Sequence, residues 1–261
     1  MRPDTREGMT EDMPSPASLP SSELLELQAQ WLAPARTQLL RRVHIARRRR
    51  ILDLGTGAGS VLSELVHRSS RSAATIGLDH SLGALTGIRV SGALRVAGDG
   101  VRLPLVDETL DLVYSQMTLL WIRPLNAVVS EIWRVLEPGG TLVALEPDYG
   151  GLMEYPESLE TRELWLTALE RAGADPCVGR KLPSILEQTG FDVLVSLFDS
   201  PHAPESARFR FLEDLPMTES ERDRFHQAAS AAQRMDQRAV WSQVAHLPFF
   251  LIRATKPADG A

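Results

Sequence analysis

The sequence predicts an α/β fold with a mostly parallel sheet of seven strands and helices on both faces. Two observations predict it. Apolar runs of strand length alternate with helical segments along most of the 261 residues. The first run, 51–54, ends in the glycine-rich turn 55–59, and the apolar residues after it stand at helical spacing. Such a strand-turn-helix unit lets a ligand approach the backbone closely.

Six further strands are expected after this first one. An acid follows the second strand at Asp79 and the third at Asp99. Because the carboxyl ends of parallel strands meet at one edge of a sheet, these acids should lie beside the glycine turn. In Rossmann-type sheets the acid after the second strand binds the two hydroxyls of an adenosine ribose. The six strands are predicted at 75–78, 94–97, 110–116, 140–147, 191–198 and 248–254.

Five motifs in this order resemble the class I S-adenosylmethionine-dependent methyltransferases of the bacterial small-molecule type. The resemblance covers about residues 45–150 and continues more loosely toward the C-terminus. It implies a Rossmann-like fold that ends in an antiparallel pair of strands, with S-adenosylmethionine as cofactor. The motifs are Asp53-Leu-Gly55-Thr-Gly57-Ala-Gly59, Leu78-Asp79-His80-Ser81, Gly98-Asp99-Gly100 with Leu103-Pro104-Leu105, Asp111-Leu-Val-Tyr-Ser115, and Glu131 through Gly140.

The resemblance also implies a set of cofactor-binding residues at the ends of the first four strands. The turn with its glycines and Thr56 admits the methionine portion, whose amino end Asp53 contacts directly or through water. Asp79 holds the ribose, and His80 flanks the adenine. Asp99 would receive the adenine amino group, and Gly100 follows it in the same motif. Ser115 and Gln116 would lie beside the transferring methyl.

The loop after the fifth strand is the expected place for catalytic residues. Asp148 would orient or deprotonate the acceptor, and Tyr149 would stack on it or hydrogen-bond to it. The alternative is that a polar loop simply occupies the end of a strand. A dedicated base is optional, because the sulfonium already activates the methyl group and alignment alone can supply roughly 7–11 kcal/mol.

The chain is expected to form one domain over residues 21–261, after a disordered tail at 1–20. A helical segment at 21–46, interrupted by Pro34, would cover the cofactor mouth as a lid or simply pack on the sheet. The core would comprise 47–198 and 246–256. Residues 199–245 are too long for a hairpin loop and predict a helical cap over the acceptor pocket. Five residues of this cap would either line the acceptor pocket or form the cap's own core: Phe209, Phe211, Phe225, His226 and Met235.

Composition narrows the function classes. The net charge of −6 gives no general attraction to nucleic acid. The arginine run 47–50 lacks interleaved aromatics and should complement a helix end and stay solvated. No apolar run is long enough to span a membrane, and no signal peptide is visible. Cys177, the single cysteine, fits a reducing cytoplasm, and neither it nor the histidines show metal-ligand spacing.

The predicted function is methyl transfer by in-line displacement to a small-molecule acceptor, with no nucleic-acid or membrane partner. A nicotinamide-dependent oxidoreductase would need a glycine where Ser60 stands. A non-catalytic S-adenosylmethionine-binding or interaction protein remains an alternative, because the acceptor site is not legible. The acceptor, its target atom and the choice between monomer and homodimer stay open.

Overall fold

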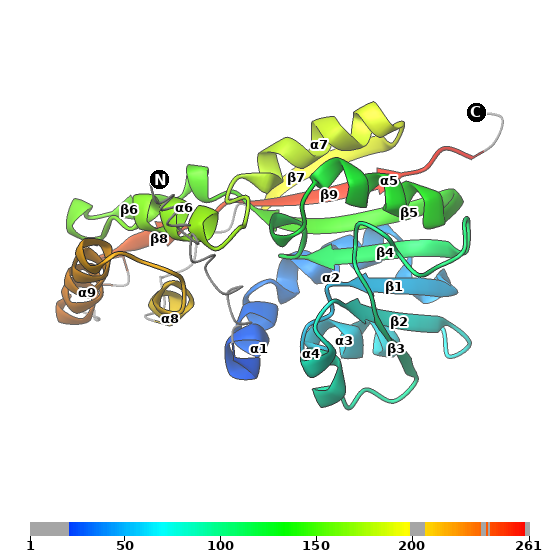
Figure 1. Cartoon of the computed structure of the whole chain (residues 1–261), viewed down its shortest axis with the longest axis horizontal. Coiled ribbons are helices and arrows are strands. Elements are labelled where there is room, and N and C mark those ends of the chain that lie inside the picture. The colour runs from blue at the N-terminus through cyan, green and yellow to red at the C-terminus, as the bar shows by residue number, and fades with distance from the viewer. Residues whose placement is uncertain (1–20, 199–206, 236–238, 240, 259–261) are drawn as a thin grey trace, which may run out of the picture.

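A computed structural model describes residues 21–198, 207–235, 239 and 241–258. Its main sheet has seven strands in the order β3-β2-β1-β4-β5-β9-β7 (Figure 1). Strands β1 to β5 pair in parallel, and β9 runs antiparallel to both β5 and β7. The predicted fold class is thereby confirmed. The strands are β1 (Arg50–Leu54), β2 (Ala74–Asp79), β3 (Ala93–Ala97), β4 (Leu110–Gln116), β5 (Leu136–Pro147), β7 (Asp192–Phe198) and β9 (Phe249–Thr255).

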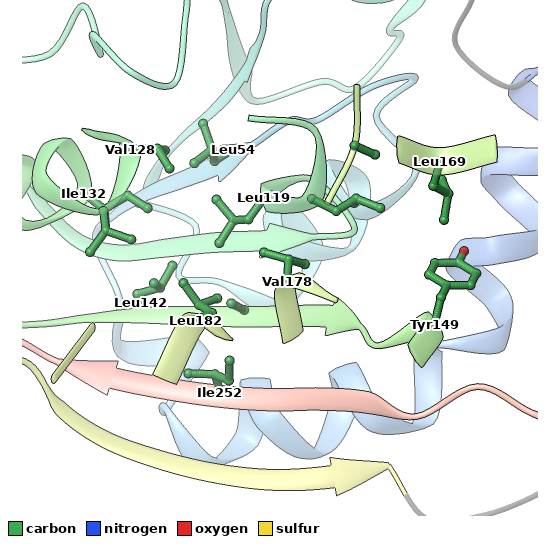
Figure 2. Close-up of a cluster of buried hydrophobic side chains, with 14 of the residues drawn as sticks. Leu54, Leu119, Val128, Ile132, Leu142, Tyr149, Leu169, Val178, Leu182 and Ile252 are labelled. Carbon is green, nitrogen blue, oxygen red and sulfur yellow. The ribbon is translucent and has the colours of Figure 1, made fainter. Parts of the chain in front are cut away.

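Helices cover both faces of this sheet. Successive strand residues point to opposite faces, so each strand contributes to two apolar layers. Leu142 packs in one layer with residues of α5 and α7, and Figure 2 shows it beside Leu182 of α7 and Ile252 of β9. Val143 packs in the other layer with residues of α2 and α3. The flanking helices are α2 (Ala33–Arg42), α3 (Ser60–Arg68), α4 (Leu82–Gly87), α5 (Leu125–Val135) and α7 (Val178–Thr189).

The N-terminal segment forms two helices, α1 (Ser22–Trp31) and α2, which is one of the two outcomes expected of Pro34, the other being a single kinked helix. Ser21 caps α1, since its hydroxyl accepts a hydrogen bond from the N–H of Leu24 over 3.3 Å. Pro34 lies in the first turn of α2, where its missing N–H costs no helical hydrogen bond. The segment therefore begins a second helix at the proline instead of bending a single one.

The cap differs from the prediction. Residues 199–245 do contain α8 (Arg208–Glu213) and α9 (Glu219–Arg234), but they are followed by a short strand, β8 (Val244–His246). This strand pairs antiparallel with β6 (Met153–Tyr155), which the sequence analysis assigned to the core. Helix α6 (Arg162–Arg171) lies beside them in Figure 1. The cap is thus built from two separate stretches of the chain, one with β6 and α6 and the other with α8, α9 and β8. The tail at 1–20 and part of 199–245 lie outside the described residues.

One of the four clustered arginines is only partly solvated, whereas the expectation was that all four stay solvated. The half-buried Arg48 donates from its guanidinium to the carbonyls of Val43 (2.9 Å) and Asp111 (2.7 Å). The Asp111 carboxylate in turn accepts from the backbone N–H groups of Arg49 and Arg50. Arg48 therefore links the segment before β1 to the start of β4 through hydrogen bonds, and its role is structural.

Candidate functional site

A cavity of about 500 Å³ lies at the carboxyl ends of β1 to β4. Its volume falls within the range of small-molecule and cofactor sites. The floor comes from the sheet edge, and the opposite wall comes from α1 and the cap. Lining residues include Gly55, Thr56, Gly57, Asp79, His80, Asp99, Gly100, Gln116 and Thr118 on the sheet side, and Leu25, Gln28, Trp121, Tyr149, Trp165, Leu169, Phe211 and Leu215 on the other.

The glycine turn adopts a backbone that other residues rarely take. Gly55, Gly57 and Gly59 have φ values of 73°, 51° and 85°. A Cβ on Gly55 would collide with the side chain of Thr118. Gly59, which stands directly before α3, packs against Ile88 and does not line the cavity. Two of the three glycines therefore border the ligand space, and the third serves packing.

Asp79 holds the glycine turn while facing the cavity. Its Oδ2 accepts from the N–H of Gly57 and its Oδ1 from the N–H of Ser81, each over 2.9 Å. A carboxylate offers about four lone-pair positions, so further acceptor capacity remains for a ligand. His80, 80% exposed, lies with its Nδ1 3.4 Å from Asp79 Oδ1.

The end of β3 contributes Asp99 and Gly100 to the cavity lining. Asp99 is exposed, and its Oδ1 accepts from the N–H of Val101 over 3.0 Å. Gly100 is buried, and a Cβ there would lie 2.8 Å from the side chain of Ile122. A larger residue at this position would therefore require the end of the Ile122 side chain to move.

Two predicted cofactor residues lie behind the cavity wall. Asp53 is buried and accepts from the Thr56 hydroxyl over 2.7 Å, and burial raises its pKa to about 7. Ser115 is fully buried, with its hydroxyl 3.3 Å from Glu146 Oε1. Neither lines the cavity, so both support the wall from within.

Gln116 lines the cavity and joins it to the N-terminal helices. Its Oε1 accepts from the Tyr114 hydroxyl over 2.7 Å and from Arg36 Nη1 over 3.1 Å. The same Arg36 atom donates to the carbonyl of Ala29 in α1 over 2.9 Å. Because Leu25, Gln28 and Ala29 all line the cavity, α1 forms part of its wall, and Arg36 of α2 joins α1 to Gln116.

Of the two predicted catalytic residues, only Tyr149 borders the cavity. Asp148 is buried and turns to Arg180, whose Nε and Nη2 lie 2.7 Å and 2.6 Å from its Oδ2. This ion pair takes Asp148 out of the cavity, and we assign it no catalytic role. Tyr149 stacks on Trp165, with ring centroids 4.9 Å apart and an interplanar angle of 29°.

Glu146 is a residue that the sequence analysis did not assign to the site. It is fully buried at the end of β5, and its Oε1 accepts from the N–H groups of Thr118 (3.2 Å) and Leu119 (3.0 Å). Burial raises its pKa to about 7. The available signal was a carboxylate in an otherwise apolar strand, because such a group must have partners in the fold.

Aromatic side chains from several elements line the cavity. Trp121, in the loop after β4, is 41% exposed and is one of them. Among the cap aromatics, Phe211 lines it too and lies 5.4 Å from Trp31 between ring centroids. Phe209 and Phe225 are buried against each other instead, in the core of the cap.

With this geometry established, known proteins can be compared. Residues 52–144 match a family model described as a methyltransferase domain. The chain is 40% identical over 98 residues to a malonyl-[acyl-carrier protein] O-methyltransferase of Methylococcus capsulatus, covering 36% of this chain and 35% of that protein. It is 37% identical over 101 residues to a demethylmenaquinone methyltransferase of Roseiflexus, covering 37% and 42%. The chain thus spans less than half the length of these curated relatives.

Solved structures extend the likeness over nearly the whole chain. A crystal structure of a SAM-dependent methyltransferase from Aquifex aeolicus superposes with a TM-score of 0.55 at 14% identity, covering 92% of this chain and all of that one. At this identity the likeness shows the fold. The chain therefore shares the fold of this methyltransferase, and residues 52–144 are similar in sequence to a methyltransferase domain.

Two features are absent from the described residues. They contain no helix long and apolar enough to cross a membrane. They also bring together no group of three or more histidine, cysteine, aspartate or glutamate side chains suited to a metal ion.

Proposed function

We propose that this protein transfers the methyl group of S-adenosylmethionine to a small-molecule acceptor. One observation carries the proposal. A single cavity joins the glycine turn, Asp79 and Asp99 at the sheet edge to an aromatic wall beneath the cap. The first part has the shape and charge for a nucleoside with a small polar tail, and the second has the chemistry for an organic acceptor.

The residues present fit the cofactor. A Cβ built on Gly57 meets nothing closer than Leu25 Cδ1 at 3.6 Å, so the turn faces open space. Asp79 would accept from the ribose hydroxyls with the lone pairs that Gly57 and Ser81 leave free. Asp99 and Gly100 would border the adenine. When bound, the sulfonium supplies an activated methyl and departs as a neutral thioether.

The chain's own contribution is alignment and exclusion of water. Residues of α1 and of the cap line the cavity together with the sheet edge, and Gln116 and Thr118 line it as well. Holding an acceptor atom in line behind the methyl group can lower the barrier by roughly 7–11 kcal/mol. The curated relatives are named for malonyl-[acyl-carrier protein] and demethylmenaquinone as acceptors, which supports a small or carrier-linked organic acceptor here as well.

The test is titration calorimetry with S-adenosylmethionine and S-adenosylhomocysteine. The wild type should bind both, and Asp79→Ala should weaken both by at least tenfold. The matched control Glu187→Ala removes an exposed acid on α7, outside the cavity, and should leave both affinities unchanged. Thermal denaturation of each variant separates loss of the ligand contact from loss of the glycine turn.

Binding should be followed by a transfer assay with labelled methyl donor. Absence of binding by the folded wild type would overturn the proposal, and binding of a nicotinamide dinucleotide instead would favour the oxidoreductase. Tight binding of the donor without transfer to any acceptor would favour a non-catalytic binding protein.

A further inference from the structure

Resting on the proposed function, we infer that the acceptor is a flat aromatic molecule with an oxygen substituent. The aromatic wall under the cap, formed by Trp121, Tyr149, Trp165 and Phe211, would bind its ring. The Tyr149 hydroxyl would donate a hydrogen bond to its oxygen. The inference depends on the shape of this wall, its charge and the state of the tyrosine hydroxyl.

The first step is the aromatic wall itself. Tyr149 and Trp165 form a stacked pair, and both rings border the cavity. They come from different elements, since Tyr149 follows β5 and Trp165 lies on α6 of the cap. Two stacked rings held from separate elements give a rigid flat surface, which an aromatic ligand matches better than a saturated one.

The second step is the scarcity of available charge in this part of the cavity. Among the described lining residues near the cap, Arg123 and Asp214 carry charges. Both side chains are exposed, Arg123 with one hydrogen bond to the carbonyl of Ala174 over 2.6 Å and Asp214 at the end of α8, so neither is a buried charged partner. A strongly charged acceptor would lose hydration without gaining a buried partner, so a neutral aromatic skeleton is favoured.

The third step is the Tyr149 hydroxyl. Tyr149 is only 6% exposed, yet no residue in the described part of the chain forms a hydrogen bond with its hydroxyl. Figure 2 shows this hydroxyl directed toward Leu169, an apolar residue that also lines the cavity. Burial raises the pKa of Tyr149, so the group stays protonated and available as a donor at neutral pH.

The hydroxyl oxygen is not fully buried, so a ligand in the cavity can reach it and accept its hydrogen bond. An oxygen substituent on the bound ring, such as a phenolic hydroxyl or a ring carbonyl, is the partner that fits. Tyr149 would then fix the rotation of the ring about its stacking axis. That makes it a positioning residue, and the wall as a whole would determine acceptor specificity.

The experiment measures binding of 2-naphthol by calorimetry, with and without saturating S-adenosylhomocysteine. Decahydro-2-naphthol, which has the same skeleton and hydroxyl but no aromatic ring, is the matched ligand. We expect 2-naphthol to bind at least tenfold more tightly. Trp165→Leu should weaken 2-naphthol by about tenfold and Tyr149→Phe by about three- to tenfold, while neither changes the affinity for S-adenosylhomocysteine more than twofold.

Trp241→Leu is the matched control, because Trp241 is 57% exposed and lies outside the cavity lining. Equal affinity for the two naphthols, no binding of 2-naphthol, or tighter binding of cyclohexylamine would overturn the inference. Failure of the proposed function is distinguishable, since it appears as loss of S-adenosylhomocysteine binding. The titration without cofactor still tests the aromatic wall in that case.

Discussion

The buried carboxylate of Glu146 accepts a hydrogen bond from the backbone N–H of Thr118 over 3.2 Å, and so joins the end of β5 to the loop after β4. The Thr118 side chain covers Gly55, where even one methyl group would collide with it. The same loop continues into Leu120, Trp121 and Ile122, which line the cavity. Glu146 thus holds the loop between the two parts of the cavity.

Glu146 should make the stability of the protein depend on pH. Burial raises its pKa in the folded state to about 7 from an ordinary value of 4.5. A raised folded-state pKa means that its contribution is complete below the unfolded pKa and is lost as the pH rises through the folded one. Relative to Glu146→Gln, which cannot ionise, the wild type should lose roughly 3 kcal/mol of unfolding free energy between about pH 4.5 and pH 8.

Urea unfolding of both proteins at the two pH values measures this difference. Asp53, whose pKa burial also raises, titrates in both proteins and cancels in the comparison. Exposed Glu187 serves as control, because Glu187→Gln should show no such pH dependence. If the difference in unfolding free energy between wild type and Glu146→Gln were the same at both pH values, Glu146 would stay charged in the folded protein.

Gly55→Ala should be more harmful than an equally strained substitution elsewhere. Gly139 has a φ of 80°, close to the 73° of Gly55, but a Cβ there would meet nothing within 4 Å. Gly139→Ala should therefore cost only backbone strain, about 1–2 kcal/mol. Gly55→Ala adds the collision with Thr118, about 1–3 kcal/mol more. Chemical denaturation gives both values, and equal losses would show that the Thr118 loop moves aside freely.

Much of the fold could be predicted because its signals are local. The strand runs, the glycine turn and the break at Pro34 all depend on residues close in the sequence, and the structure contains each of them. The pairing of β6 with β8 could not be predicted in this way. Met153 and His246, which pair there, lie far apart in the chain, and three-residue strands carry almost no periodic pattern.

Side-chain direction limited the prediction of the site. Ser115 and Gln116 are consecutive in β4, so their side chains point to opposite faces, and only Gln116 reaches the cavity. Because side chains alternate between the two faces of a strand, Ser115 and Gln116 could not both face the same ligand. For Asp148, the direction is set by Arg180, a partner more than thirty residues further along the chain that no local pattern indicates.

Arg36→Met should loosen the N-terminal helices. Buried Arg36 pairs with Glu64 at 2.6 Å and hydrogen-bonds to Ala29 and Gln116, and methionine would replace only its packing. Breaking one side of a largely buried pair costs roughly 2–4 kcal/mol. Hydrogen exchange should show faster exchange of the α1 amides in Arg36→Met. The control is Arg41→Met, an exposed residue of the same helix α2, which should leave α1 unchanged. Equal protection of α1 in both variants would show that Arg36 does not hold the segment.

Asp148→Asn should reduce stability without affecting cofactor binding. It weakens the ion pair with Arg180 at a buried position, at a cost of about 1–3 kcal/mol. Asp175→Asn is the matched control. Asp175 pairs with Lys181 at 2.8 Å at a more exposed site, where a pair is worth less than about 1 kcal/mol. Both variants should bind S-adenosylhomocysteine like the wild type. If instead Asp148→Asn kept full stability and normal binding but lost methyl transfer, Asp148 would act on the acceptor, and its ion pair with Arg180 would have to open during the reaction.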